Sequence, residues 1–128
     1  MKSAEDRSKQ DKADQYPQIR GQLIALIRNG RRKAAFTHER PADVRFREVL
    51  CPESGFPLTE RGMWEEIVRL LDSGVRLTCL PLRQPPGEKA WVFRARFAPG
   101  FPVIYVKLQM LGGTVLVRSF HPSERGHE

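Results

Sequence analysis

The sequence predicts an α+β fold in which two N-terminal helices pack on an antiparallel sheet of three or four strands. Two observations lead to this prediction. Apolar residues recur at helical spacing up to residue 74 and alternate with polar ones after residue 75, and helices that precede all the strands are typical of α+β domains. The chain has 128 residues, 40% of them hydrophobic, which is enough for one core. We expect one domain over residues 16–121, between a disordered tail at 1–15 and a short tail at 122–128.

The first helix is expected to begin at Tyr16 and Pro17, because proline is well tolerated in a first helical turn. Apolar side chains from Ile19 to Ile27 then repeat at helical intervals. Gly30 follows as a candidate left-handed cap at the C-terminal end.

A basic cluster, Arg31, Arg32 and Lys33, comes directly after this helix. Cations suit the negative end of a helix dipole. The cluster fits a solvated turn and a phosphate-contacting patch equally well, and the sequence leaves both open. Residues 40–58 contain three prolines and are expected to form a loop, with one short extended piece at 44–50.

The second helix is expected to begin after Thr59, a good N-cap, and to end at Gly74. Its apolar stripe runs from Met63 to Leu71. Strands are then predicted at 75–82, at 90–97 and in a hairpin over 103–121 that folds about Gly112 and Gly113.

The two faces of this hairpin differ in character. A two-residue turn places Leu108 opposite Val117 and Lys107 opposite Arg118, which leaves one face apolar. The other face holds Tyr105, Lys107, Gln109, Leu116, Arg118 and Phe120, and Arg94 and Arg96 of the preceding strand can share it. Because like charges opposite each other destabilise a sheet, this face is either an anion-binding surface or an ordinary wet face.

His121 is the residue that strict register explains least well. Counting back from the turn puts it opposite Ile104, on the apolar side and away from Tyr105. Either His121 lies past the last pair of the ladder, or the glycine turn holds a bulge that shifts the register. The sequence leaves both alternatives open.

The charge of the chain indicates an anionic partner. The 22 basic and 15 acidic residues give a net charge of +7, and residues 16–121 alone hold 17 basic and 9 acidic side chains, or +8. This excess indicates a nucleic acid or an acidic protein as partner, whereas solubility alone is the other explanation. Most of the basic residues are arginines, whose planar fork favours phosphate.

The cysteines and the apolar runs indicate the cellular compartment that we expect for the protein. Cys51 and Cys79 have no metal-site spacing and no secretory segment before them. No apolar run reaches the roughly 20 residues that cross a bilayer. We therefore expect buried free thiols in a cytoplasmic protein that has no membrane partner, no metal and no cofactor.

Four segments of the chain resemble, in the same order, the motifs of a known protein family. They are LIALIRNGRRKAAFT, a GM-x-x-x-[IV]-x-x-L helix from Gly62 to Leu70, Trp91 fourteen residues before Tyr105, and the strand patterns IYVK and VRSFH. Together they resemble the ribonuclease toxins of the motility-quorum-sensing-regulator (MqsR) type, from bacterial type II toxin–antitoxin systems. The resemblance covers residues 18–121.

The resemblance implies a RelE-like microbial ribonuclease fold and an endoribonuclease (mRNA interferase) activity. It also implies mRNA, a cognate antitoxin protein and the ribosome as partners. The family's active site contains the tyrosine of the penultimate strand and the basic residue after Ser-Phe, which correspond to Tyr105 and His121. The family has lysine where this chain has His121, and its glutamine after the tryptophan is Val92 here.

Metal-free RNA cleavage needs a base for the 2′-hydroxyl, an acid for the 5′-oxygen and cations around the phosphorane. A histidine, with an ordinary pKa of about 6.5, can be the acid or the base. We expect catalytic roles for Tyr105, His121, Lys107 and Arg118, and RNA-binding roles for Arg94, Arg96, Arg83, Arg31, Arg32 and Lys33. Two alternatives remain: a non-catalytic RNA- or ribosome-binding module, and a small protein whose basic face docks an acidic partner.

Overall fold

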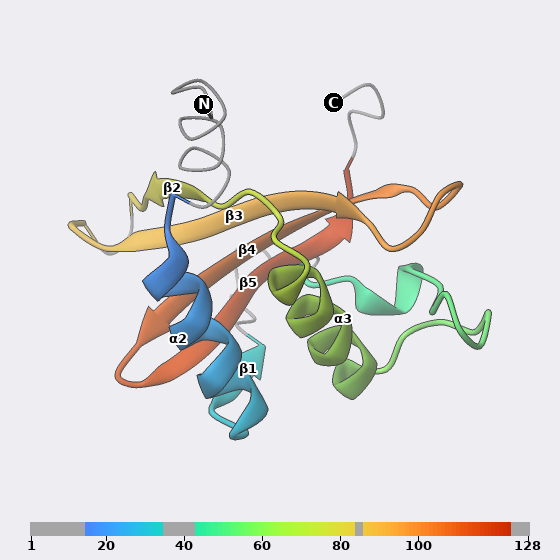
Figure 1. Cartoon of the computed structure of the whole chain (residues 1–128), viewed down its shortest axis with the longest axis horizontal. Coiled ribbons are helices and arrows are strands. Elements are labelled where there is room, and N and C mark those ends of the chain that lie inside the picture. The colour runs from blue at the N-terminus through green and yellow to red at the C-terminus, as the bar shows by residue number, and fades with distance from the viewer. Residues whose placement is uncertain (1–14, 35–42, 84–85, 124–128) are drawn as a thin grey trace, which may run out of the picture.

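The computed structural model describes residues 15–34, 43–83 and 86–123, so the predicted tails lie almost wholly outside the described residues. Helices α2 (Pro17–Arg28) and α3 (Glu60–Asp72) lie on one face of a five-stranded sheet (Figure 1). The strands, in the order β1-β5-β4-β3-β2 across the sheet, are β1 (Arg32–Ala34), β5 (Thr114–Pro122), β4 (Val103–Leu111), β3 (Lys89–Arg96) and β2 (Thr78–Pro81). The α+β class is confirmed, but the sheet is larger than expected and mixed.

Both helices begin and end as the sequence predicts. Pro17 is the first residue of α2, and Gly30 follows its C-terminal end with a φ of 80°. That left-handed backbone suits glycine, which has no Cβ to clash. At α3, the Thr59 hydroxyl accepts a hydrogen bond from the Gly62 N–H at 3.0 Å, which satisfies one of the unpaired donors of the first turn.

Two segments before α3 differ from the sequence expectation. The basic cluster is not a turn, because Arg32–Ala34 form β1, which pairs with β5 in parallel. The extended piece expected at 44–50 is also wrong, since Phe46–Glu48 form a short 3-10 helix, η1. Only Val44 continues the sheet, through a parallel bridge to Phe120. These pairings join residues more than 70 positions apart, so no local pattern announces them.

The β4–β5 hairpin follows strict register only near its turn. Gly112 and Gly113 have φ values of 59° and 78°, as a two-residue turn with two left-handed positions requires. Leu108 lies opposite Val117, as predicted. The register then shifts, Lys107 pairs with Ser119, and Arg118 is the extra residue of a β-bulge. The predicted pairing of Lys107 with Arg118 is therefore wrong.

The bulge reverses the faces of every β5 residue that follows it. Phe120, expected on the polar face, pairs with Val106 and is fully buried. The core forms between the helices and this face of the sheet; from the sheet it includes Ile104, Val106, Leu108, Val115, Val117 and Phe120. Because side chains alternate along a strand, Tyr105 and Lys107 lie on the opposite face, away from the helices.

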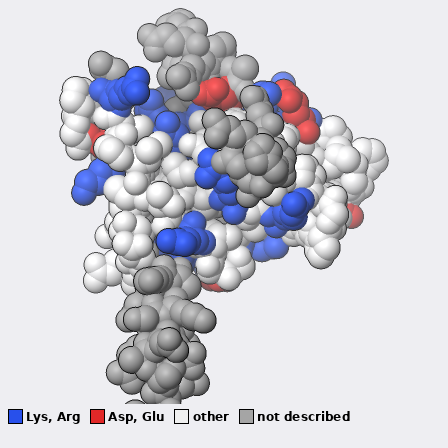
Figure 2. Space-filling model, turned by 90° about the horizontal axis from the view of Figure 1, so that it is seen from above, with Lys and Arg blue, Asp and Glu red and all other residues white. Residues whose placement is uncertain are grey.

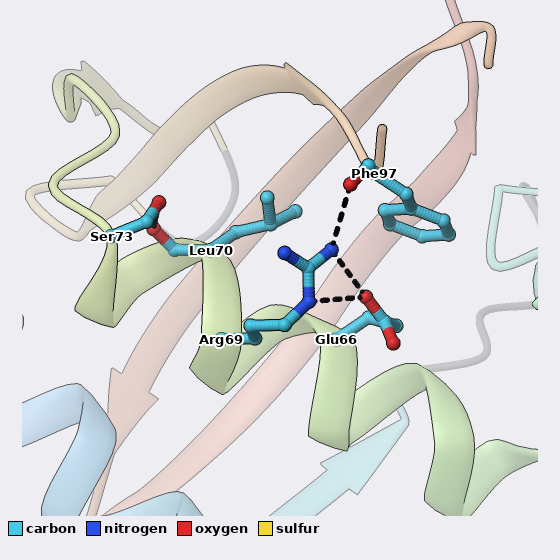
Figure 3. A network of polar contacts seen from close by, with 5 residues as sticks. All are labelled: Glu66, Arg69, Leu70, Ser73 and Phe97. Atoms are coloured by element: carbon cyan, nitrogen blue, oxygen red, sulfur yellow. Dashed lines mark hydrogen bonds and ion pairs between the residues drawn. The ribbon is translucent and has the colours of Figure 1, made fainter. Parts of the chain in front are cut away.

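A polar network fastens α3 to the sheet (Figure 3). Glu66 is 5% exposed, and its Oε1 accepts hydrogen bonds from Arg69 Nε at 2.9 Å and Nη2 at 2.6 Å. The same Nη2 donates to the carbonyl of Phe97, just after β3, at 3.1 Å. A buried carboxylate needs such a partner. These contacts hold the helical layer in place and leave the opposite face of the sheet to the candidate site.

Candidate active site

Three chemistry-bearing side chains form a row across the outer face of the sheet. Arg94 on β3 pairs with Tyr105 on β4, which pairs with His121 on β5. The Arg94 Cζ atom lies 4.9 Å from the centre of the Tyr105 ring, in cation–π range. The rings of Tyr105 and His121 lie 5.4 Å apart at an interplanar angle of 30°. Tyr105 and His121 are half-buried, whereas Arg94 is exposed.

The bulge at Arg118 creates this row. Without an extra residue His121 would lie opposite Ile104, on the core face. With it, Pro122 pairs with Ile104 and His121 pairs with Tyr105. Of the two alternatives that the sequence left open, the register shift is the one observed, but it occurs in the middle of β5 and not at the glycine turn. The predicted pair Tyr105 and His121 therefore comes together.

The tautomer of His121 follows from one contact. Its Nδ1 lies 2.8 Å from the carbonyl oxygen of Pro122. A carbonyl can only accept, so Nδ1 carries the proton in this hydrogen bond. In the neutral ring Nε2 is then the free acceptor, which is the form that a general base requires.

Tyr105 remains protonated at neutral pH. Burial raises its pKa above the ordinary value, the nearby Arg94 lowers it, and the nearby Asp43 raises it further, with burial the largest of the three. A neutral phenol can donate a hydrogen bond or a proton to an oxygen. The pair therefore combines a histidine with a free acceptor and a tyrosine with a donor.

Asp43 is a neighbour of the row that the sequence interpretation missed. Asp43 falls in the stretch predicted to form a loop, but its backbone carbonyl accepts a hydrogen bond from the Phe120 N–H at 2.8 Å. The Arg45 N–H in turn donates to the Phe120 carbonyl at 2.7 Å. These bonds place residues 43–45 along β5, next to His121. No sequence signal indicates this, because the pairing is parallel and joins residues far apart in the chain.

We predict that the Tyr105→Phe variant is less sensitive to alkaline pH than the wild-type protein. Because the pKa of Tyr105 is raised in the folded state, its contribution to stability is fully present below the unfolded pKa of about 10 and is lost as the pH rises through the folded pKa. Urea denaturation from about pH 8 to about pH 11 measures this difference. Tyr16→Phe, which removes the other tyrosine, is the control. Identical pH dependence of wild type and Tyr105→Phe would contradict the prediction.

The remaining predicted catalytic residues lie on the same face but differ in their contacts. Lys107 is half-buried and lies between Val92 of β3 and Ser119 of β5. Arg118 turns toward Gln109, donating from Nη1 to Oε1 at 2.9 Å. Lys107 is thus close to the row, whereas Arg118 supports the buried Gln109 side chain.

The predicted RNA-binding residues do not form one patch with the row. Arg94 belongs to the row, and Arg96 braces the turn after β3 by donating to the Phe101 carbonyl at 2.6 Å. The cluster Arg31, Arg32 and Lys33 lies at β1, whereas Arg83 follows β2. Since β1 and β2 are the two opposite edges of the sheet, these cations lie on opposite sides of the row. Lys and Arg also cover far more of the surface than Asp and Glu when it is seen from above (Figure 2).

Three further properties of the described residues concern metal ligands, membrane spans and cysteines. No three or more of their His, Cys, Asp or Glu side chains gather where they could hold a metal ion. None of their helices combines the length and the apolar character needed to span a bilayer. Cys51 and Cys79 are free, as predicted, but are half-buried and not fully enclosed. Backbone and side-chain hydrogen bonds from Ser54 lower the pKa of the Cys51 thiol.

The chain was compared with protein-family models, with curated proteins and with solved structures, and none of the three comparisons gave a match. The site and the chemistry that its residues allow are therefore what indicates the class of protein.

Proposed function

We propose that this protein is a metal-independent endoribonuclease, an mRNA interferase toxin that cleaves RNA through attack of the 2′-hydroxyl. The observation that carries the proposal is the bulge-dependent pairing of Tyr105 with His121 on the face away from the helices. An ordinary polar face needs no titratable pair, whereas phosphodiester cleavage needs an acid and a base that lie close together. The order of motifs shared with MqsR-type toxins supports the same function.

In the proposed reaction His121 removes the proton of the 2′-hydroxyl and Tyr105 donates a proton to the 5′-oxygen. Nε2 of neutral His121 accepts the proton of the 2′-hydroxyl, whose oxygen attacks the adjacent phosphorus. The bond from phosphorus to the 5′-oxygen breaks, and the Tyr105 hydroxyl donates its proton to that oxygen. The products carry a 2′,3′-cyclic phosphate and a 5′-hydroxyl. A proton returned from His121 to Tyr105 through solvent restores both residues.

The cations of the row have a separate task in this proposal. The phosphorane carries more negative charge than the substrate, so positive groups nearby stabilise it. Arg94 over the Tyr105 ring, and Lys107 two residues along β4, are the nearest candidates. The basic residues at the two sheet edges would bind flanking nucleotides through their phosphates. A cognate antitoxin and the ribosome are the further proposed partners, in the cytoplasm.

A cleavage assay with excess chelator tests the proposal. A labelled RNA of mixed sequence is incubated with the purified protein and EDTA, and the ends of the products are analysed. We expect cleavage that EDTA does not reduce, with cyclic phosphate at the 3′ ends. Loss of cleavage in EDTA would contradict the metal-independent mechanism. Salt-dependent RNA binding without any product would instead favour the non-catalytic RNA-binding module.

The toxin part of the proposal has its own readout. Expression in a bacterial host is expected to stop growth, and co-expression of the adjacent reading frame, the proposed antitoxin, is expected to restore it. Normal growth in both cases would contradict the toxin role. The ribonuclease activity is tested separately, by the cleavage assay with EDTA.

A further inference from the structure

The Tyr105 ring lies between two other flat side chains on the outer face of the sheet. Because β4 runs between β3 and β5, Arg94 on β3 and His121 on β5 approach Tyr105 from opposite sides. The Arg94 Cζ atom is 4.9 Å from the centre of the Tyr105 ring, and the centre of the His121 ring is 5.4 Å from it. Both distances are close to the spacing of about 4.8 Å between neighbouring strands. Tyr105 therefore has a close neighbour on each side.

These two neighbours restrict how the half-buried Tyr105 side chain can lie. Side chains stand roughly perpendicular to a sheet, so the phenol hydroxyl, at the far end of the ring, points away from the strands. A swing of the ring toward β3 would meet Arg94, and a swing toward β5 would meet His121. The row thus holds the hydroxyl at one place above the sheet.

Charged and titratable groups also surround the phenol. Arg94 comes from β3, His121 from β5, Asp43 from the segment before η1, and Lys107 lies two residues along β4. Arg94 lowers the pKa of Tyr105, whereas burial and Asp43 raise it. A cation beside a phenol favours the phenolate. Arg94 is therefore the neighbour that makes Tyr105 a stronger acid.

We propose that Arg94 is a positioning residue that acts through Tyr105, a role beyond the stabilisation of the phosphorane by its charge. This inference rests on the proposed ribonuclease function. The guanidinium plane keeps the ring between itself and His121, so that the hydroxyl stays within reach of the 5′-oxygen. When the O–H bond breaks and the proton passes to that oxygen, the electron pair stays on the phenolate. The Arg94 cation is already in place beside this new charge, so its stabilisation needs no rearrangement.

A titration without RNA tests the contact itself. The chain has two tyrosines, so Tyr16→Phe leaves Tyr105 as the only phenol. In this background its ionisation is followed by ultraviolet absorbance from about pH 8 to about pH 12, with circular dichroism at each pH to check the fold. Arg94→Met, which removes the cation, is expected to move the midpoint to higher pH. The matched control is Arg96→Met on the same strand, since Arg96 donates to the Phe101 carbonyl and should affect the midpoint far less.

The kinetics of RNA cleavage at neutral pH test the role in the reaction. Arg94→Lys keeps a positive charge but loses the flat guanidinium. We expect its kcat to fall about ten- to a hundredfold, because a small misplacement of a reacting group has effects of this size. Its KM for RNA should stay close to the wild-type value. A residue that only bound the substrate's phosphates would instead change KM and leave kcat as it was.

Two outcomes would overturn the proposal. One is a Tyr105 midpoint that does not move in Arg94→Met, and the other is a wild-type kcat in Arg94→Lys. With a wild-type protein that cleaves RNA, either outcome contradicts only the role of Arg94. A midpoint that moves as expected in a protein that cleaves no RNA would contradict the ribonuclease proposal, and with it the role of Arg94 in the reaction, while the contact between Arg94 and Tyr105 would stand.

Discussion

The His121→Ala variant is expected to cleave RNA about 10²–10⁴-fold more slowly than the wild type, which is the usual contribution of one general acid or base. His121 is the only histidine within the described residues, and its neutral form leaves Nε2 free as an acceptor. Its removal takes the base from the 2′-hydroxyl and leaves Arg94 and Tyr105 in place. RNA binding, measured by fluorescence polarisation, should therefore fall far less than cleavage.

The control for this prediction is a second histidine. His127→Ala changes a residue five positions beyond the end of β5 and should cleave at the wild-type rate. Urea denaturation of both variants checks that half-buried His121 is not needed for folding. If folded His121→Ala cleaves RNA as fast as the wild type, His121 is not the base, and the proposed mechanism is wrong.

The Phe120→Ala variant is expected to lose about 3–5 kcal/mol of unfolding free energy, the usual cost of removing a fully buried phenylalanine. Phe120 is 0% exposed and packs among the core residues, with its ring centre 6.3 Å from that of Phe97. Domains have only about 5–15 kcal/mol of stability, so the loss should be plain in urea or thermal denaturation.

This variant also tests the register on which the candidate site depends. In a hairpin without the bulge Phe120 would lie on the outer face, and His121 would lie opposite Ile104. The matched control is Phe56→Ala, since Phe56 is 71% exposed and should cost well under about 1 kcal/mol. Equal and small effects of the two substitutions would show that Phe120 is outside the core. The pairing of Tyr105 with His121 would then also be wrong, because the same register shift produces both.

The helices and the hairpin turn could be predicted because their signals are local. Pro17, Thr59 and Gly30 act on the backbone within a few positions of themselves. The two glycines of the hairpin turn adopt left-handed φ angles, and this turn does not depend on how the rest of the two strands pair. Tyr105 and His121 were predicted as site residues from the resemblance to MqsR-type toxins, and the structure shows that they pair across β4 and β5.

The arrangement of these residues depended on contacts between distant segments. No particular residue type marks the position of this bulge in the sequence. The bulge is favoured here because it places Phe120 in the core, whereas strict register would expose that ring. The bridge of Val44 to Phe120, with Asp43 and Arg45 bonded to the same residue, likewise joins segments that only the folded sheet brings together.

The sequence by itself thus determined the α+β class, the two capped helices, the glycine turn and the excess of positive charge. The tertiary structure alone decided that the basic cluster joins the sheet as β1 and that the cations are divided between opposite edges. It alone decided that His121 faces Tyr105 and not the core. The physical reason is that helix caps and turns depend on the conformation of a few neighbouring residues, whereas strand register depends on which distant apolar side chains the whole core can bury.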